Sequence, residues 1–373
     1  MKIQVKREEI LKVIQRTQGI VEKKSTMPIL SNLLIETEKG GIDIVATDLE
    51  IGIRDKCPAK VLEEGGVALS ARKAFEILRE INGEDILIEK ENNNWVKITN
   101  GHSEFRIMGI GKEEFPTLPE AKEATLLTLD ADLLNKMLKK TIYASGESDS
   151  RYVLNGLLFA LRPAAKNISL TMVGTDGHRL AIINKSIEAN NTGLKGEQSV
   201  IIPKKAAIEI KKLLDEGDEA LSISLDKNHI IFKRGNTILL SRLIEGNYPS
   251  YEQVLVTTHD KKIALNRDLF MGALRRVSIL SKEKTNAVKL DIEKDKILLS
   301  TSNPDMGEAK EELEASYKGE SLAIGFNARY LIDALGAMDS ENITIDLYDP
   351  LSPAFLMEEG ETDYKCVVMP MRI

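Results

Sequence analysis

The chain has 373 residues, of which 42% are apolar and 29% are charged, and its net charge is −7. Such a composition is typical of a soluble globular protein that can bury several cores. The opening MKIQVKREEI has no apolar signal core, and no run of about 18 uncharged apolar residues occurs. We therefore expect neither secretion nor membrane insertion, and we place the protein in the cytoplasm. Cys57 and Cys366 lie far apart without metal-ligand spacing, which predicts reduced core thiols rather than a disulfide framework.

The same order of elements recurs three times along the chain. Each copy carries two helix-forming stretches, which are Arg7–Val21 and Ala71 onward, Asp132–Ser145 and Pro203 onward, and Arg267–Ser281 and Asn327 onward. Paired strand-like runs close each copy. The period of about 124 residues is too long for a solenoid repeat and about right for a domain. We predict three tandem copies of one domain, at residues 1–122, 123–253 and 254–373.

The first copy shows how one domain is built. Apolar residues of Arg7–Val21 recur at spacings of three, four and seven, which predicts a helix with one buried face. MPILSNLLIET from Met27 and the alternating GGIDIVATD from Gly40 predict a hairpin, and the turn Asn100-Gly101 predicts another. One helix with several antiparallel strands, twice over, predicts an α+β domain whose helices cover one face of its sheets.

Positive charge is concentrated in six helix-forming windows, which are residues 1–24, 70–79, 133–143, 203–214, 267–284 and 327–338. Together these windows carry +15, which leaves −22 for the rest of the chain. Basic helices on an acidic body predict a positive surface that faces phosphates. The alternative is that lysine and arginine simply fill the polar faces of amphipathic helices.

Catalytic and metal-binding patterns are scarce. Of four histidines, only His178 lies in a suggestive phrase, TDGHRL from Thr175, where a turn could hold a base or a metal ligand. The alternative is a tight turn between two strands, capped by Asp176 and with Gly177 at positive φ. We favour the turn, because no second histidine, cysteine or acidic pair shares its spacing. We therefore expect a protein that is not an enzyme and that has no metal or other cofactor.

Five phrases resemble, in order and spacing, the bacterial β sliding clamp family: SRYVLNGLLF from Ser150, VGTDGHRLAI from Val173, RLIEGNYPSYEQVL from Arg242, NARYLIDAL from Asn327 and VVMPMRI from Val367. The resemblance covers the whole chain. It implies a processivity subunit of the replicative DNA polymerase, in which two three-domain chains join head to tail into a ring of six domains. Helices would line the inner face around duplex DNA, and antiparallel sheets would lie outside. A ring held by topology needs only weak, sequence-independent phosphate contacts.

The resemblance also implies a cleft between the second and third domains that receives linear peptides from the polymerase, the clamp loader and repair proteins. The matching positions are Leu154, Thr175, Gly177, His178, Arg179, Leu180, Pro249, Val254, Tyr330, Ser352, Val367, Met369, Pro370, Met371 and Arg372. Leucine, valine, methionine and proline offer an adaptable apolar pocket, with Arg179 and Arg372 on its rim. The alternative for VVMPMRI is a final core strand. We expect the terminus to be docked.

DNA contacts implied by the resemblance fall at Lys24, Arg72, Ser148, Tyr152 and Val153, and charge adds Lys204 and Lys205. Ser148 stands where some relatives have glutamine, and Val153 stands where they have a second aromatic residue. Tyr152 alone is then left to stack against nucleic acid, so whether Val153 removes a single-strand contact stays open.

A homodimer implied by the family would place Phe105 and Ile107 of one copy against Ile279 and Leu280 of the other. Its complementary charges would be Arg72 and Lys73 on one side and Glu308, Glu311 and Glu312 on the other.

Two rival interpretations come from other classes of protein. An enzyme acting at the TDGHR turn would lose turnover when His178 is replaced. An open three-domain binding scaffold has no need of a dimer, so its mass in solution would distinguish it from a ring.

Overall fold

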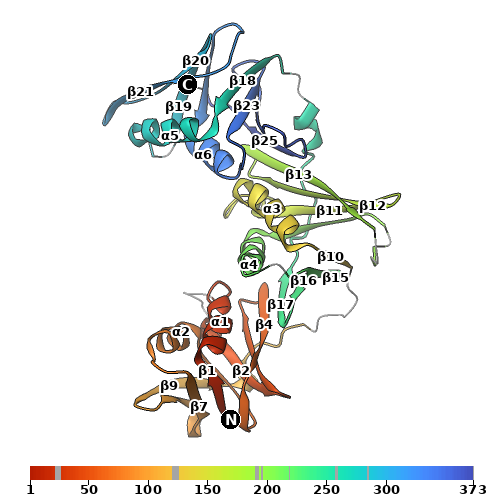
Figure 1. Cartoon of the computed structure of the whole chain (residues 1–373), viewed down its shortest axis with the longest axis vertical. Coiled ribbons are helices and arrows are strands. Elements are labelled where there is room, and N and C mark those ends of the chain that lie inside the picture. The colour runs from red at the N-terminus through yellow and green to blue at the C-terminus, as the bar shows by residue number, and fades with distance from the viewer. Residues whose placement is uncertain are drawn as a thin grey trace. The chain divides into compact units, whose positions relative to one another are not determined.

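The computed structural model describes residues 1–21, 27–119, 126–189, 193–194, 196–217, 219–256, 259–283 and 285–372. They form two compact units, each of which is described by itself (Figure 1). Unit 1 comprises Met1–Asp132, Asn191–Gly193 and Glu209–Leu243, and unit 2 comprises Leu133–Asn190, Leu194–Ile208 and Ile244–Ile373. No helix in the described ranges is long and apolar enough to cross a membrane.

Six α-helices occur among these residues: α1 Arg7–Thr17, α2 Ala71–Glu80, α3 Ala131–Thr141, α4 Lys204–Leu214, α5 Arg267–Val277 and α6 Ala328–Gly336. All six lie where the sequence predicts them, but α1, α3 and α5 end four residues before the predicted ends. The hydroxyls of Thr17 and Thr141 donate to the carbonyls of Ile14 and Met137, which weakens the helical ladder there. Short 3₁₀ turns follow α3 and α5, at Ile142–Ala144 and Ser278–Leu280.

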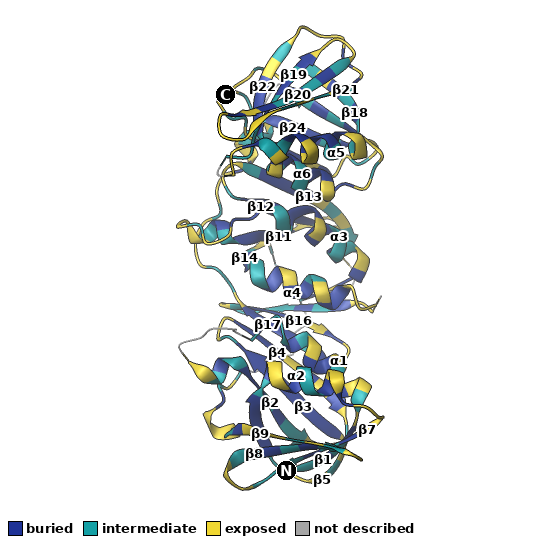
Figure 2. Cartoon of the chain, turned by 90° about the vertical axis from the view of Figure 1, so that its left-hand side faces the viewer, coloured by how far each residue is buried: buried dark blue, intermediate teal, exposed yellow. Residues whose placement is uncertain are grey.

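The helices are amphipathic, as predicted (Figure 2). In α1, Ile10, Val13 and Ile14 are buried while Glu8 and Glu9 are exposed. Within unit 1, α1 packs beside α2, and within unit 2, α5 packs beside α6. Each pair therefore buries one face and leaves a polar face to solvent.

The described residues of unit 1 form one antiparallel sheet in the order β10-β15-β16-β17-β4-β3-β2-β6-β9-β8-β7-β1-β5. Its strands are β1 Lys2–Lys6, β2 Asn32–Glu38, β3 Gly41–Thr47, β4 Ile51–Pro58, β5 Lys60–Glu63, β6 Gly66–Ser70, β7 Asp85–Lys90, β8 Trp95–Asn100, β9 Ser103–Gly111, β10 Leu127–Leu129, β15 Leu221–Leu225, β16 His229–Arg234 and β17 Thr237–Arg242. The turn predicted at Asn100-Gly101 joins β8 to β9, and Gly101 has a φ of 48°.

In unit 2 the described residues form two antiparallel sheets, in the orders β14-β11-β12-β13-β25-β24-β23-β18 and β21-β20-β19-β22. Their strands are β11 Gly156–Ala164, β12 Asn167–Thr175, β13 Arg179–Glu188, β14 Gln198–Pro203, β18 Lys261–Asn266, β19 Ala287–Glu293, β20 Lys296–Asn303, β21 Gly307–Glu314, β22 Leu322–Asn327, β23 Asn342–Leu347, β24 Ala354–Glu358 and β25 Tyr364–Val368.

The predicted threefold repeat is present in the strand order. Each repeat has a three-strand meander after its first helix: β2–β4 in the first repeat, β11–β13 in the second and β19–β21 in the third. Each repeat has another three-strand meander after its second helix: β7–β9, β15–β17 and β23–β25 in the same order. Successive repeats join edge to edge. Strand β4 pairs with β17, with Ile53 opposite Leu239, and β13 pairs with β25, with Ala181 opposite Cys366. Both cysteines are free and buried, as predicted, and burial raises the pKa of Cys57 to about 12 and that of Cys366 to about 11.

Candidate functional site

The TDGHR phrase forms a tight turn between β12 and β13. Asp176 Oδ1 accepts hydrogen bonds from the backbone N–H groups of His178 and Arg179, at 2.9 and 3.0 Å. Gly177 has a φ of 85°, and His178 is exposed with its ring stacked on Tyr330. The turn interpretation is therefore confirmed. Across the described ranges, no group of three or more histidine, cysteine or acidic residues is placed to hold a metal.

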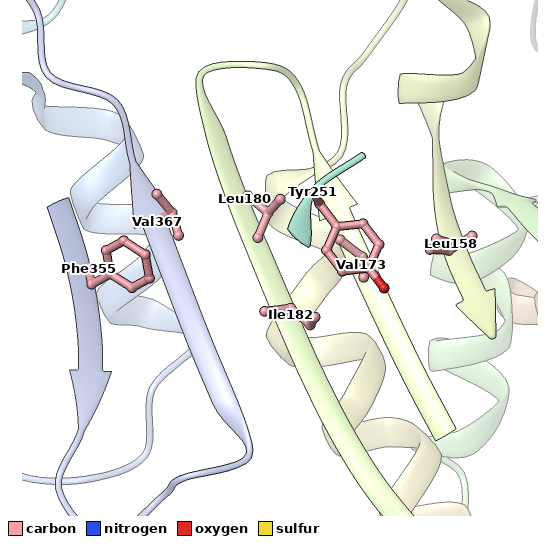
Figure 3. Packing of buried hydrophobic residues seen from close by; sticks show 7 residues of the cluster. All are labelled: Leu158, Val173, Leu180, Ile182, Tyr251, Phe355 and Val367. Atoms are coloured by element: carbon pink, nitrogen blue, oxygen red, sulfur yellow. The ribbon is translucent and has the colours of Figure 1, made fainter. Parts of the chain in front are cut away.

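An apolar cluster spans the junction between the second and third repeats within unit 2 (Figure 3). We call it the junction cluster; its buried members are Leu158, Val173, Leu180, Ile182, Tyr251, Phe355 and Val367, with Tyr248, Val254 and Leu255 packed against it. Leu180 on β13 is paired directly with Val367 on β25, which fixes the two repeats in register. Of the ten side chains, the sequence predicted Leu180, Val254 and Val367 as site residues.

Tyr248 is a site residue that sequence reasoning missed. Its hydroxyl accepts from the backbone N–H of Thr175 at 3.1 Å and donates to the carbonyl of Val173 at 3.2 Å. Burial raises the pKa of Tyr248. The hydroxyl thus fastens the segment after β17 onto β12, beside the turn at Asp176. The two tyrosines of the phrase NYPSY were the available signal, because aromatic side chains bury large areas and a buried tyrosine hydroxyl usually finds a hydrogen-bond partner.

Arg179, predicted on the rim of the pocket, is engaged by acidic groups of its own chain. Its side chain is only 9% exposed, and it pairs with Asp176 at 3.1 Å and with Asp333 at 2.7 Å. Its guanidinium also lies over the rings of Tyr330 and Tyr143, at 4.6 and 5.4 Å. Arg179 therefore links β13 to α6 and positions Tyr330, because a guanidinium can stack and form ion pairs at once.

The end of the chain is docked as far as Met371, as expected; Arg372 is exposed, and Ile373 lies outside the described residues. The backbone N–H of Met369 donates to the carbonyl of His178 at 2.8 Å, and that of Met371 donates to Gly325 at 2.8 Å. Val367 is 1% exposed and belongs to β25, so for this residue the core-strand interpretation is correct. Met369 is 38% exposed and lies past the strand.

The remaining predicted cleft residues are placed as follows. Leu154 is buried in the 3₁₀ turn Tyr152–Asn155, and Pro249 is exposed. The backbone N–H of Ser352 donates to Asp349 in the turn before β24.

One loop, Ser145–Asn155, carries three of the predicted DNA contacts. Its residue Ser148 has a positive φ of 58°, Tyr152 is 78% exposed, and Val153 lies against Gly246. Lys204 at the start of α4 joins this loop, because its Nζ donates to the carbonyl of Ser145 at 3.0 Å. Arg72 lies in unit 1, Lys205 is partly buried in α4, and Lys24 lies outside the described residues.

Among the residues predicted for the dimer contact, the apolar side chains are exposed or partly exposed. The charged side chains among them have hydrogen-bond partners within the chain. Ile279 is 70% exposed, and Leu280, Phe105 and Ile107 are partly exposed. Hydrogen bonds from Lys73 and Arg72 lower the pKa of Glu76 to about 2. On β21, Glu311 accepts from Arg276 at 3.0 Å and Glu312 from Lys296 at 2.8 Å, while Glu308 accepts from Ser302.

Comparisons with known proteins agree with this architecture. Sequence models of the N-terminal, central and C-terminal domains of the DNA polymerase III beta subunit match residues 1–119, 128–250 and 252–372. The chain is 33% identical to the beta sliding clamp of Pseudomonas putida and 32% identical to that of Escherichia coli, over the full length of each. It superposes on the crystal structure of the Bartonella birtlesii sliding clamp bound to griselimycin with a TM-score of 0.93, at 33% identity and complete coverage of both chains.

Three tandem clamp domains, built from antiparallel sheets and paired helices, define a processivity factor of DNA replication. The chain belongs to the bacterial beta sliding clamp family, the beta subunits of DNA polymerase III. This family is not catalytic, so the chain is not an enzyme.

Proposed function

We propose that two copies of this chain close head to tail into a six-domain ring around duplex DNA in the cytoplasm. Domain boundaries after residues 122 and 253 divide the chain into its three clamp domains. The junction cluster tethers the replicative polymerase, the clamp loader and repair proteins through short linear peptides. The observation that carries the proposal of a ring is a pair of sheet edges, at β21 and β9, that are left open among the described residues of one copy.

The two internal joins follow one rule, which pairs the third strand of one repeat with the last strand of the next. These joins are β4 with β17 and β13 with β25. In the third repeat the equivalent third strand is β21, whose pairing among the described residues is with β20 alone. In the first repeat the equivalent last strand is β9, whose residues Ser103–Met108 pair with β8 only. Unpaired strand edges invite pairing, so β21 of one copy fits β9 of another.

The helix ends support the same contact. Aligning α3 and α5 by their last residues, Thr141 and Val277, makes Tyr143 equivalent to Ile279. Tyr143 reaches over its junction to β25, where its hydroxyl donates to Cys366 Sγ at 3.1 Å. Cys366 is the third residue of β25, and the third residue of the equivalent strand β9 is Phe105. Ile279 should therefore meet Phe105 of a second copy, which is the pair that the family resemblance implies.

The DNA contact is supported by charge placement. Cations are concentrated in the helix-forming windows while the whole chain is acidic. Sequence-independent binding needs only phosphate contacts, and these depend strongly on salt. The peptide contact is supported by the composition of the junction cluster, since a buried aromatic and aliphatic floor beside Met369 suits apolar anchors of a linear peptide.

The ring is tested by breaking the apolar contact. The double variant Ile279→Ala/Leu280→Ala should sediment as a soluble monomer, because it removes apolar area from the interface between copies without emptying a core. The intact chain should stay on a closed circular DNA and leave after the circle is cut, whereas the variant should not be retained on either form.

A matched control is Leu269→Ala, which truncates another exposed side chain of the same repeat, 63% exposed on α5. This control should remain a dimer. An unchanged dimer in the double variant would overturn the interface assignment, and an intact chain that is monomeric at every concentration would favour the open scaffold.

A further inference from the structure

Lys204, one of the predicted DNA contacts, already holds an anion of its own chain. Its Nζ lies 2.9 Å from Oε1 of Glu147 and 3.0 Å from the carbonyl oxygen of Ser145. The Lys204 side chain is 15% exposed, whereas that of Glu147 is 81% exposed. The carboxylate therefore covers the lysine on its solvent side, which is the side from which a phosphate would arrive.

Glu147 is carried by a loop that is braced internally. The backbone N–H of Gly146 donates to the carbonyl of Leu154 at 2.8 Å, which closes the loop at its base. Asn155 accepts from the N–H of Asp149 and donates back to its carbonyl, at 2.8 and 2.9 Å. The same loop presents Tyr152. Glu147 thus sits among the residues expected to meet DNA, in a position that the fold defines.

The chemistry of this contact is that of a phosphate mimic. Carboxylate and phosphodiester oxygens both accept charge-assisted hydrogen bonds from an ammonium group. A hydrogen bond from Lys204 lowers the pKa of Glu147, so the carboxylate stays ionised at neutral pH. A phosphate must therefore displace Glu147 or bind beside a like charge, and either event weakens binding.

We propose that Glu147 is a built-in competitor for the phosphate seat at Lys204, which lowers the affinity of the clamp for duplex DNA. The inference rests on the proposed DNA contact and adds a residue that works against it. A ring that is retained by topology has no need of tight phosphate contacts, and weak contacts favour sliding. In unit 1 the predicted DNA contact Arg72 also pairs with a carboxylate of its own chain, since its Nε donates to Glu76 at 2.8 Å, but there the cation is the more exposed partner, at 80% against 34%.

The test is a double-mutant cycle on affinity for a short linear duplex, measured by fluorescence anisotropy over a salt series. Glu147→Gln should tighten binding about three- to tenfold near 0.05 M salt and steepen the salt slope by up to about one unit. In a Lys204→Met background the same substitution should change affinity less than about twofold, because there is no longer an ammonium group for which Glu147 and a phosphate compete. Thermal melting of each variant checks that the fold is intact.

Glu64→Gln is the matched control, since it removes the same charge from the turn between β5 and β6 in unit 1. It should leave affinity nearly unchanged. The inference is overturned if the intact chain binds duplex and Glu147→Gln binds no more tightly, or if the gain persists without Lys204. It is also overturned if Glu64→Gln gives an equal gain, which would show a general charge effect. A chain that binds no duplex even at low salt would contradict the DNA contact itself, and this inference with it.

Discussion

The first and second repeats contain the same apolar cluster in two versions. In repeat 1, Val45, Ala68 and Phe115 form a buried cluster with Leu34 and Leu118 packed against it. In repeat 2 the matching positions are held by residues of the junction cluster. Leu34 is paired with Val45 as Leu158 is paired with Val173, and the phrase FPTL from Phe115 matches YPSY from Tyr248. The two clusters differ in how far they reach.

The difference arises on the strand that follows the Thr-Asp turn. Where β13 carries Leu180 and Ile182, β4 carries Gly52 and Arg54. Leu118 lies directly over Gly52, so that a Cβ added there would be 2.5 Å from Leu118 Cδ2. Arg54 is 45% exposed and lies 3.9 Å from Asp43.

The repeat-1 cluster therefore ends at the phrase FPTL, which covers it. The repeat-2 cluster continues onto Val367 and Phe355 of the next repeat. The backbone pairing is the same at both joins. The residues at these two positions thus account for how far each apolar cluster extends across its join. On our proposal, only the longer cluster offers a surface for a peptide.

The largest effect on stability is expected from replacing Ile182 of repeat 2 with arginine, the residue at the matching position of repeat 1. Ile182 is 4% exposed, so Ile182→Arg places an unpaired cation in the junction cluster. We expect a loss of about 3 kcal/mol or more in the free energy of unfolding, measured by urea titration. Peptide affinity should fall at least about tenfold in any folded fraction.

The reciprocal variant Arg54→Ile is the matched control. Arg54 is half-exposed and its ion pair is long, so the change should be less than about 1 kcal/mol. Equal losses from both variants would mean that these two positions do not set the extent of the cluster.

Local chemistry explains what the sequence could predict of the fold. The helices, the Asn100-Gly101 hairpin and the Thr-Asp-Gly-His turn are all determined by neighbouring residues, and all are confirmed. The strands β1 and β6 were not predicted; β1 pairs with β7 and β6 with β2, so each is held by a segment far along the chain.

The candidate site was harder to predict from the sequence, because its residues come from distant parts of the chain. Leu180 and Val367 came from the family resemblance, but Phe355 joins them from a strand more than 170 residues away from Leu180. Nothing near Arg179 in the sequence indicates Asp333 as its partner, and nothing near Lys204 indicates Glu147. Ion pairs between distant segments follow from the tertiary structure and have no periodic signal.

An intermediate effect is expected from removing Met369–Ile373, the segment that flanks the junction cluster. Deleting Met369–Ile373 should lower affinity for a short polymerase peptide by about 2 kcal/mol, or roughly thirtyfold. The dimer should persist, and stability should fall by only about 1–2 kcal/mol, because the described part of the segment is held by two backbone hydrogen bonds. Isothermal titration and thermal melting measure the two quantities.

Met306→Ala is the control for this deletion, since it truncates an exposed methionine in the same repeat. It should leave peptide affinity unchanged. Unchanged affinity in the truncated chain would place the peptide site elsewhere, and a lost melting transition would show that the segment is part of the core.

The smallest effect concerns ionic contacts that reinforce the second junction. Glu361, in the turn between β24 and β25, accepts hydrogen bonds from Lys136 on α3 and Lys185 on β13. Burial opposes ionisation of this carboxyl, but the two lysines prevail and lower its pKa from 4.5 to about 2. A lowered pKa in the folded state means that the ionised form stabilises the fold at any pH above 4.5. This contribution is lost as the pH falls from 4.5 towards 2.

The intact chain should therefore be more stable than Glu361→Gln by about 1–2 kcal/mol at pH 6, and the difference should shrink to near zero by pH 2. Urea unfolding of both chains at a series of pH values measures it. In a Lys136→Met/Lys185→Met background, Glu361→Gln should produce little of this pH-dependent difference, because the lysines are its cause. A difference that stays constant down to pH 2 would show that Glu361 acts through packing, and that the ionic contacts add nothing to the apolar join between the second and third domains.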